Sequence, residues 1–112
     1  MSITWIDDDE KLIGVWGYSP DSFSYIPAFS IWDIEQENIM FWFAGPEPEV
    51  VYNDGNLYSW DPVRNGVSIW YCKTGEQLYH NDQFKAYLFH CQSKTWISFD
   101  KTNNSVSFLK IQ

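Results

Sequence analysis

The chain has 112 residues and a formal net charge of -8, with 45% hydrophobic and 20% aromatic residues. This size and apolar content support one globular domain and exclude a disordered chain, because disordered chains are poor in aromatic residues. No apolar run approaches the roughly 20 residues that a membrane-spanning helix needs, and the acidic start of the chain does not look like a signal peptide. We therefore expect a single cytoplasmic domain over residues 1–112.

The charges are unevenly distributed along the chain. Residues 1–61 carry twelve acidic side chains and one basic one, Lys11, whereas residues 62–112 carry three acidic and six basic ones. Nucleic acids and anionic membranes are bound mainly through Lys and Arg, so this balance argues against both as direct partners. A cationic protein is the natural partner of an acidic surface, although acidic side chains also serve simply to keep a small protein soluble.

Short runs of β-branched and aromatic residues alternate with turns rich in Gly, Asn, Asp and Pro. The runs are too short for ordinary helices and favour strands. In chain order, we predict strands at residues 3–6, 12–18, 23–26, 28–35, 39–44, 50–52, 57–60, 67–72, 77–79, 84–91, 95–99 and 106–111. Pro27 lacks a backbone donor, so the chain around it is expected to be bent, bulged or at a sheet edge.

No internal repeat divides the chain, and the pattern predicts an all-β antiparallel domain, either a meander-type barrel or a two-sheet sandwich. Two predicted strands are apolar on both faces: residues 39–44 throughout, and most of residues 67–72. Such strands must be covered on both sides. We expect the cover to come from within the fold, with an interface to a partner protein as the alternative.

The sequence Gly14-Val15-Trp16 lies on the second predicted strand. It resembles the Gly-x-Trp signature of the lipocalin and calycin superfamily, which implies an antiparallel barrel, closed at one end by Trp16, that holds a small apolar ligand. That family also places an Arg on a late strand, whereas here Arg64 lies in a predicted turn and the late strand carries Lys110. Taken without the resemblance, Trp16 is a core aromatic and Gly14 a position of close approach on a curved strand.

Motifs for catalysis and metal binding are lacking. The spacing of Cys72, Cys91, His80 and His90 matches no zinc site. We expect both cysteines to be unbridged thiols, and neither a metal nor an organic cofactor to be needed for folding. No nucleophile elbow, phosphate-binding Gly-rich loop or zincin motif occurs, so we do not expect an enzyme.

Asp33 and Glu35 lie two residues apart on a predicted strand, which would place both carboxylates on one face. Paired carboxylates beside aromatic residues are typical of glycosidases, but a solvated strand face has the same pattern. A non-catalytic carbohydrate-binding module that uses exposed Trp or Tyr side chains is a further interpretation.

Acidic and aromatic residues alternate between residues 32 and 61, and we predict that this acidic-aromatic belt binds a partner. Acids would steer a cationic protein into encounter, and aromatic side chains would be buried against it. Pro46 and Pro48 hold two of the acids on a stiff loop, which lowers the entropy lost on binding. The belt comprises Asp33, Glu35, Glu37, Glu47, Glu49, Asp54 and Asp61 together with Trp32, Tyr52, Tyr58 and Trp60.

A small, acidic, single-domain chain without catalytic motifs resembles the bacterial immunity proteins of contact-dependent growth inhibition and related systems. The resemblance is one of kind and carries no residue motif. It implies an inhibitor that occludes the active site of a cationic toxin, often a nuclease, by imitating the charge of the nucleic acid. The alternatives are the calycin-like barrel with a small apolar ligand and the carbohydrate-binding module.

Overall fold

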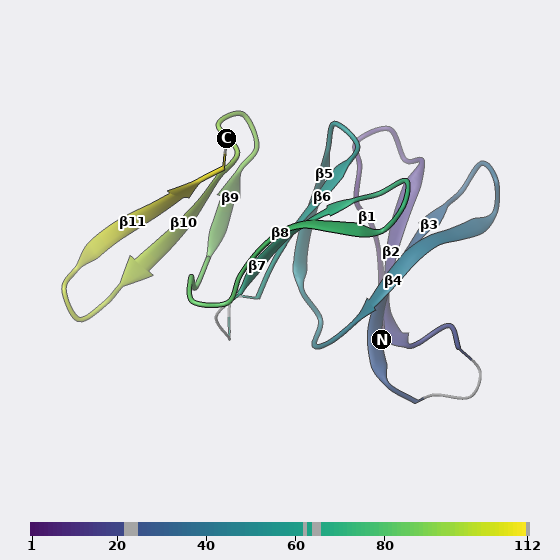
Figure 1. The fold of residues 1–112 in the computed structure, drawn as a ribbon, viewed down its shortest axis with the longest axis horizontal. Helices are drawn as coiled ribbons and strands as arrows, with labels where there is room; N and C mark the ends of the chain where they lie inside the picture. Colours follow the sequence, from purple (N-terminus) through teal and green to yellow (C-terminus); the bar gives the residue numbers. More distant parts are fainter. Residues whose placement is uncertain (22–24, 62, 64–65, 112) are drawn as a thin grey trace.

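The computed structural model describes residues 1–21, 25–61, 63 and 66–111, and these residues form strands joined by turns and loops (Figure 1). The strands are β1 (Ser2–Trp5), β2 (Leu12–Tyr18), β3 (Pro27–Asp33), β4 (Asn38–Ala44), β5 (Glu49–Asn53), β6 (Asn56–Trp60), β7 (Val67–Tyr71), β8 (Glu76–Asn81), β9 (Leu88–His90), β10 (Thr95–Asp100) and β11 (Ser105–Lys110). They form three sheets, which we call the first (β1–β4), the middle (β5–β8) and the third (β9–β11).

Each sheet is an antiparallel meander in which every strand pairs with the next one along the chain. Figure 1 shows the middle sheet between the first and the third. The prediction of an all-β antiparallel fold is thus confirmed. The described strands do not close into a barrel but pack in layers like a sandwich, with three sheets instead of two. The closed barrel implied by the calycin resemblance is therefore not found in them.

Two apolar clusters hold the three sheets together. Ile31 of the first sheet and Leu57 of the middle sheet are fully buried in the first cluster. Ile69 of the middle sheet and Trp96 of the third are buried in the second cluster. Because successive side chains of a strand point to opposite faces, the middle sheet contributes to both clusters. Burial of one such large apolar side chain contributes about 1.5–3 kcal/mol.

Most predicted strands occur close to their predicted limits. The strand predicted at residues 12–18 is β2 without change, and β3 begins at Pro27, where a missing donor is tolerated at the first residue of a strand. The strand predicted at 28–35 is shorter than expected, because residues 34–37 form a turn.

Two further predictions differ from the structure. Only Leu88–His90 of the strand predicted at residues 84–91 is a strand. Of the strand predicted at 23–26, Tyr25 and Ile26 are outside any strand, and residues 23–24 lie outside the described residues. Strand propensity and flanking turn residues do not distinguish a paired strand from a loop that packs on a core.

The two doubly apolar strands have different surroundings. β7 lies within the middle sheet and contributes Ile69 to one cluster and Trp70 to the other, so it is covered within the fold as predicted. β4 contributes Phe41 and Phe43 to the first cluster, but Trp42 on its other face is exposed. The prediction of cover from within the fold is therefore confirmed for both faces of β7. For β4 it holds only for the face that carries Phe41 and Phe43.

Gly14 is a position of close approach, as predicted. A Cβ atom at Gly14 would lie 2.3 Å from Cζ of Phe29, which is fully buried in the first cluster. Trp16, on the same face of β2, packs against that cluster. In the described part of the chain, no helix has the length and apolarity needed to cross a membrane.

Candidate functional site

Alternate turns of a meander lie at opposite ends of its strands, so the stack of sheets has two rims. The turns β1–β2, β3–β4, β5–β6 and β9–β10 lie along the upper edge of Figure 1. Hydrogen bonds connect this rim from sheet to sheet. Tyr52 N–H donates to the carbonyl of Ile6 at 3.1 Å, and Lys94 Nζ donates to Oδ1 of Asn53 at 2.8 Å. The turns of the three sheets therefore form one continuous edge.

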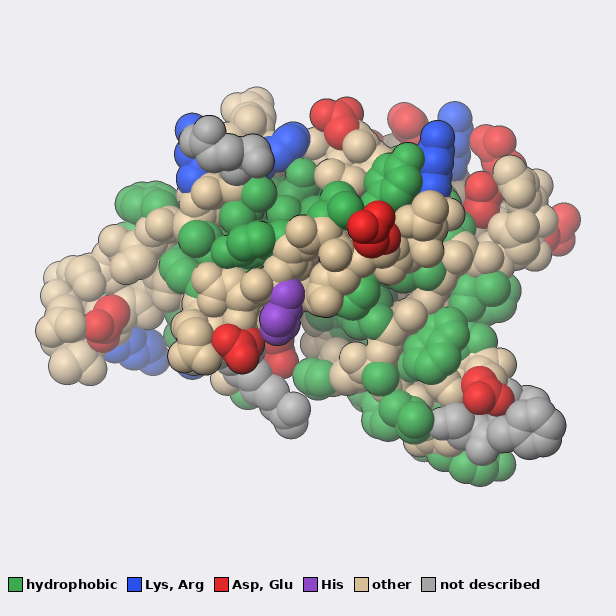
Figure 2. Space-filling model, viewed as in Figure 1, with side chains coloured by type: hydrophobic (Ala, Val, Ile, Leu, Met, Phe, Trp, Pro, Cys, Tyr) green, Lys and Arg blue, Asp and Glu red, His purple; other side chains and the backbone are tan. Residues whose placement is uncertain are grey.

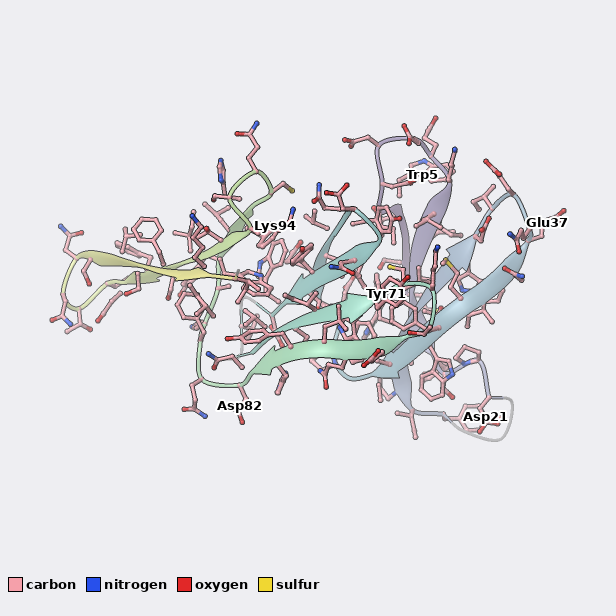
Figure 3. The ribbon with its side chains drawn as sticks, turned by 45° about the horizontal axis from the view of Figure 1, so that its top comes forward. Trp5, Asp21, Glu37, Tyr71, Asp82 and Lys94 are labelled. Carbon is pink, nitrogen blue, oxygen red and sulfur yellow. The ribbon has the colours of Figure 1, made fainter. Side chains whose placement is uncertain are left out.

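Eight carboxylates of the first and middle sheets lie on this edge, and we call them the acidic rim. They are Asp7, Asp8, Asp9, Glu10, Asp33, Glu35, Glu37 and Asp54. Figure 2 shows acidic side chains gathered at the upper right, over the end of the first sheet. In Figure 3, Glu37 and Lys94 lie on the side of this rim, whereas Asp21 and Asp82 lie on the opposite side.

Two of these carboxylates hold the turns that carry the others. Asp7 Oδ1 accepts hydrogen bonds from the backbone N–H groups of Lys11 and Leu12, both at 3.1 Å. Asp33 Oδ1 accepts a hydrogen bond from the N–H of Gln36 at 3.1 Å. Such side-chain bonds to nearby backbone groups stabilise tight turns. The other six carboxylates of the acidic rim are exposed. The turns held by Asp7 and Asp33 therefore position charged groups that stay in contact with solvent.

A pocket of about 340 Å³ opens at the acidic rim between the first and middle sheets. Its lining includes Asp7, Asp9, Asp33, Glu35 and Tyr52, opposed by Lys11 and Lys73. Burial raises the pKa of Tyr52, so its hydroxyl stays neutral at physiological pH and keeps a hydrogen to donate. Four carboxylates against two lysines give the pocket a net negative charge, which favours a Lys or Arg side chain as ligand.

A second acidic pocket, of about 400 Å³, lies at the opposite rim beside the loop between β4 and β5. Its carboxylates belong to Glu47, Glu49 and Asp61. Ser2 Oγ donates a hydrogen bond to Oε2 of Glu47 at 2.5 Å, so the loop is attached to the beginning of β1. We call this pocket the proline-loop pocket, because Pro48 also lines it.

The structure divides the predicted acidic-aromatic belt into separate parts. The acidic rim holds Asp33, Glu35, Glu37, Asp54 and the neighbouring Tyr52, whereas the proline-loop pocket holds Glu47, Glu49 and Asp61. Trp32 is half-buried on the face of the first sheet that points away from the middle sheet, and its Nε1 donates to Oγ of Ser30 at 2.9 Å. It therefore belongs to neither acidic site.

Tyr58 and Trp60 of the predicted belt lie inside the protein. They are 2% and 8% exposed, and both belong to the second cluster between the middle and third sheets. They are core residues in this fold and supply no surface for a partner.

The pairing predicted for Asp33 and Glu35 is also corrected. β3 ends at Asp33, and Glu35 lies in the following turn, so the two do not share a strand face. The run of residues 7–10, which the predicted belt omitted, supplies half of the acidic rim. Its signal was present in the sequence, because four consecutive acids between two paired strands must lie at a turn.

The Cys72 thiol is buried, and the His80 imidazole lies within hydrogen-bonding distance of a serine. Burial raises the pKa of the Cys72 thiol to about 12, so Cys72 is not a thiolate nucleophile at neutral pH. Both cysteines are free thiols. Ser68 Oγ lies 2.9 Å from Nδ1 of His80, its register partner on the adjacent strand. The described residues contain no group of three His, Cys, Asp or Glu side chains placed to hold a metal ion.

Comparison with known proteins finds no family model that matches this chain and no curated protein that matches it.

Proposed function

We propose that this protein is a non-catalytic immunity protein, which binds a cationic protein toxin through the acidic rim and thereby neutralises it. The observation that supports this proposal is the convergence of turns from two sheets, which presents eight carboxylates on one edge. Carboxylates gathered in this way repel one another, and a basic partner relieves that repulsion.

We propose that the protein covers the active site of the toxin and catalyses no reaction itself. A nuclease binds phosphate through Lys and Arg side chains, and a rigid row of carboxylates offers those side chains a similar pattern of charge. The pocket at the acidic rim would receive one cationic side chain, with Asp9 and Glu35 beside it and the Tyr52 hydroxyl as a neutral hydrogen-bonding group. The turns are held by Asp7 and Asp33, so little conformational entropy is lost on binding.

The test is an association experiment with a matched control. The tagged chain captures its partner from the native organism, and stopped-flow kinetics then follow binding of the purified partner at several salt concentrations. Asp9→Lys changes a residue of the pocket at the acidic rim, whereas Asp82→Lys makes the same change of charge at the opposite rim. We expect Asp9→Lys to slow association several-fold and Asp82→Lys to leave it close to the wild-type rate, because surface charges near a contact act mainly on the on-rate.

Two results would contradict the proposal. Equal slowing by Asp9→Lys and Asp82→Lys would assign the effect to net charge and not to the acidic rim. A captured partner that keeps its full toxic activity in the complex would show binding without neutralisation. Melting curves of both variants, measured beside the kinetics, separate these results from a loss of folding.

A further inference from the structure

An internal repeat connects the three sheets. The third strands β3, β7 and β11 contain Ser30-Ile31-Trp32, Ser68-Ile69-Trp70 and Ser107-Phe108-Leu109. The first two serines are 38 residues apart, and the second and third are 39 apart. A repeat of this length, with four strands in each of the first two sheets, is typical of architectures built from one supersecondary unit stacked on its neighbours.

The middle residue of each tripeptide points toward the next sheet along the chain. Ile31 of the first sheet is 0% exposed and packs against the middle sheet, and Ile69 of the middle sheet is 4% exposed and packs against the third. Phe108 occupies the same position in the third sheet but is 68% exposed. The repeat thus predicts a further sheet over Phe108.

The last residue of each tripeptide points toward the preceding sheet. Trp70 packs into the first cluster, against the first sheet, and Leu109 packs into the second cluster, against the middle sheet. Trp32 has the same position in the first sheet, and its face points away from the middle sheet. The outer face of the first sheet therefore corresponds to the faces of the middle and third sheets that pack against a preceding sheet. The outer face of the third sheet corresponds to the faces of the first and middle sheets that pack against a following sheet.

Both end faces are apolar, as this equivalence requires. By register, the outer face of the third sheet carries Leu88, Ile97, Phe99, Val106 and Phe108. The outer face of the first sheet carries Ile3, Trp5, Ile13, Val15, Trp32 and Trp42. Exposed apolar patches of this extent mark interaction surfaces, and apolar faces of antiparallel sheets are normally covered.

The charges of the two ends are complementary. The first sheet and its turns, residues 1–44, carry eight acidic side chains and one basic one, whereas residues 82–112 carry two acidic and four basic ones. Contact between the third sheet of one chain and the first sheet of another brings these unlike ends together. Contact between two first sheets brings like charges together, and this is unfavourable.

We propose that the two end faces bind each other between two copies of this chain, head to tail, to form a closed ring of six sheets. Four-stranded sheets repeated around an axis form β-propellers, which have about four to eight sheets. Each chain has two sheets of four strands and one of three. Two copies therefore give six sheets, the one multiple of three in that range. The contact is heterologous, so it ends in a ring only if the rotation between sheets closes.

The test is the mass of the full chain in solution, measured by sedimentation equilibrium and native mass spectrometry. We expect a species of about twice the 13.3 kDa of one chain, which dissociates on dilution. Phe108→Asp places a charge on one end face and Ile3→Asp places one on the other, and each should give a monomer. Val63→Asp is the matched control, because Val63 is 80% exposed in the β6–β7 connection and lies on neither face; it should remain dimeric.

Mixing the two monomeric variants tests the head-to-tail arrangement directly. Ile3→Asp keeps an intact third-sheet face and Phe108→Asp keeps an intact first-sheet face, so the mixture should regain one interface and form an open heterodimer. A wild-type chain that is monomeric at high micromolar concentration would overturn the proposal. Self-association abolished by only one of the two variants, or growth into filaments, would overturn it as well. Circular dichroism of each variant establishes that it is folded.

Discussion

The indole ring of Trp70 stacks on the phenyl ring of Phe43, with 4.5 Å between the ring centroids and 7° between their planes. The two residues lie on β7 and β4, which belong to different sheets and share no strand pairing. Trp70 is also held within its own sheet, because its Nε1 donates to Oγ of Ser59 at 3.2 Å. This contact joins the two layers through packed side chains where no strand pairing connects them.

Replacement of Trp70 tests this junction. We expect Trp70→Ala to lower the free energy of unfolding by about 3–5 kcal/mol, because it leaves a large cavity between two sheets. Trp70→Phe keeps an aromatic ring against Phe43 and should cost less, chiefly through lost packing and the lost hydrogen bond to Ser59. Urea unfolding followed by circular dichroism measures both. An equal loss in the two variants would show that stacking does not stabilise the junction.

The close approach at Gly14 gives a second prediction on stability. A Cβ atom there would lie 2.3 Å from Phe29 Cζ and 3.1 Å from Ile6 Cγ2. Both neighbours are buried, so we expect Gly14→Ala to cost about 1–3 kcal/mol through overpacking. Gly17→Ala on the same strand is the control, since its Cβ would meet the flexible side chain of Met1 at 3.1 Å. Thermal melting that places the two variants at the same Tm would contradict this account.

The buried thiol of Cys72 predicts a dependence of stability on pH. Burial raises its pKa from 9.0 in the unfolded chain to about 12 in the folded one. As the pH rises, the unfolded chain therefore loses the thiol proton before the folded chain does. The contribution of Cys72 to the free energy of unfolding is fully present below about pH 9 and is lost progressively as the pH rises toward about 12. Denaturant unfolding of the wild type and of Cys72→Ala between pH 8 and 11 measures it. A parallel decline of the two curves would exclude Cys72 as the cause.

Cys72 and Cys91 should also differ in chemical reactivity. Cys72 is buried and stays protonated, whereas Cys91 is only half-buried in the β9–β10 turn. Because the thiolate is the reactive form, a thiol reagent at pH 8 should label Cys91 first and Cys72 only as fast as the protein opens. Mass spectrometry of partially labelled protein identifies the site. Labelling of Cys72 at the rate of Cys91 would be inconsistent with the buried position.

The proline-loop pocket gives a prediction on partner binding. If the cationic partner binds the acidic rim, Glu47→Lys combined with Glu49→Lys at the opposite rim should slow association less than Asp9→Lys does, because screening limits surface charges to about 8 Å at physiological ionic strength. Both side chains are exposed, so the melting temperature should change little. Stopped-flow kinetics with the captured partner, beside melting curves, are the measurement. Slowing as large as that caused by Asp9→Lys would place the partner contact at the proline-loop pocket and not at the acidic rim.

Much of the local structure followed from the sequence. Turn residues such as those at 53–56 and 73–76 lie between runs with strand propensity, and these local preferences place β5, β6, β7 and β8 close to their observed limits. The acidic surface of the N-terminal half of the chain could also be predicted, because charged side chains remain at the surface. The close approach at Gly14 could also be predicted, because a residue without a side chain in an apolar strand indicates a crowded site.

Only the tertiary structure decided how these strands were grouped and which aromatic side chains were buried. Alternation of apolar and polar residues identifies the buried face of a strand only when the other face meets water. The middle sheet is covered on both faces, so this signal is lost, and Tyr58 and Trp60 could not be distinguished from surface residues. The repeat was hidden too, because Leu109 and Phe108 replace Trp70 and Ile69 in the third sheet. What it preserves is the direction of each side chain toward a neighbouring sheet, and that becomes visible only when the sheets are stacked.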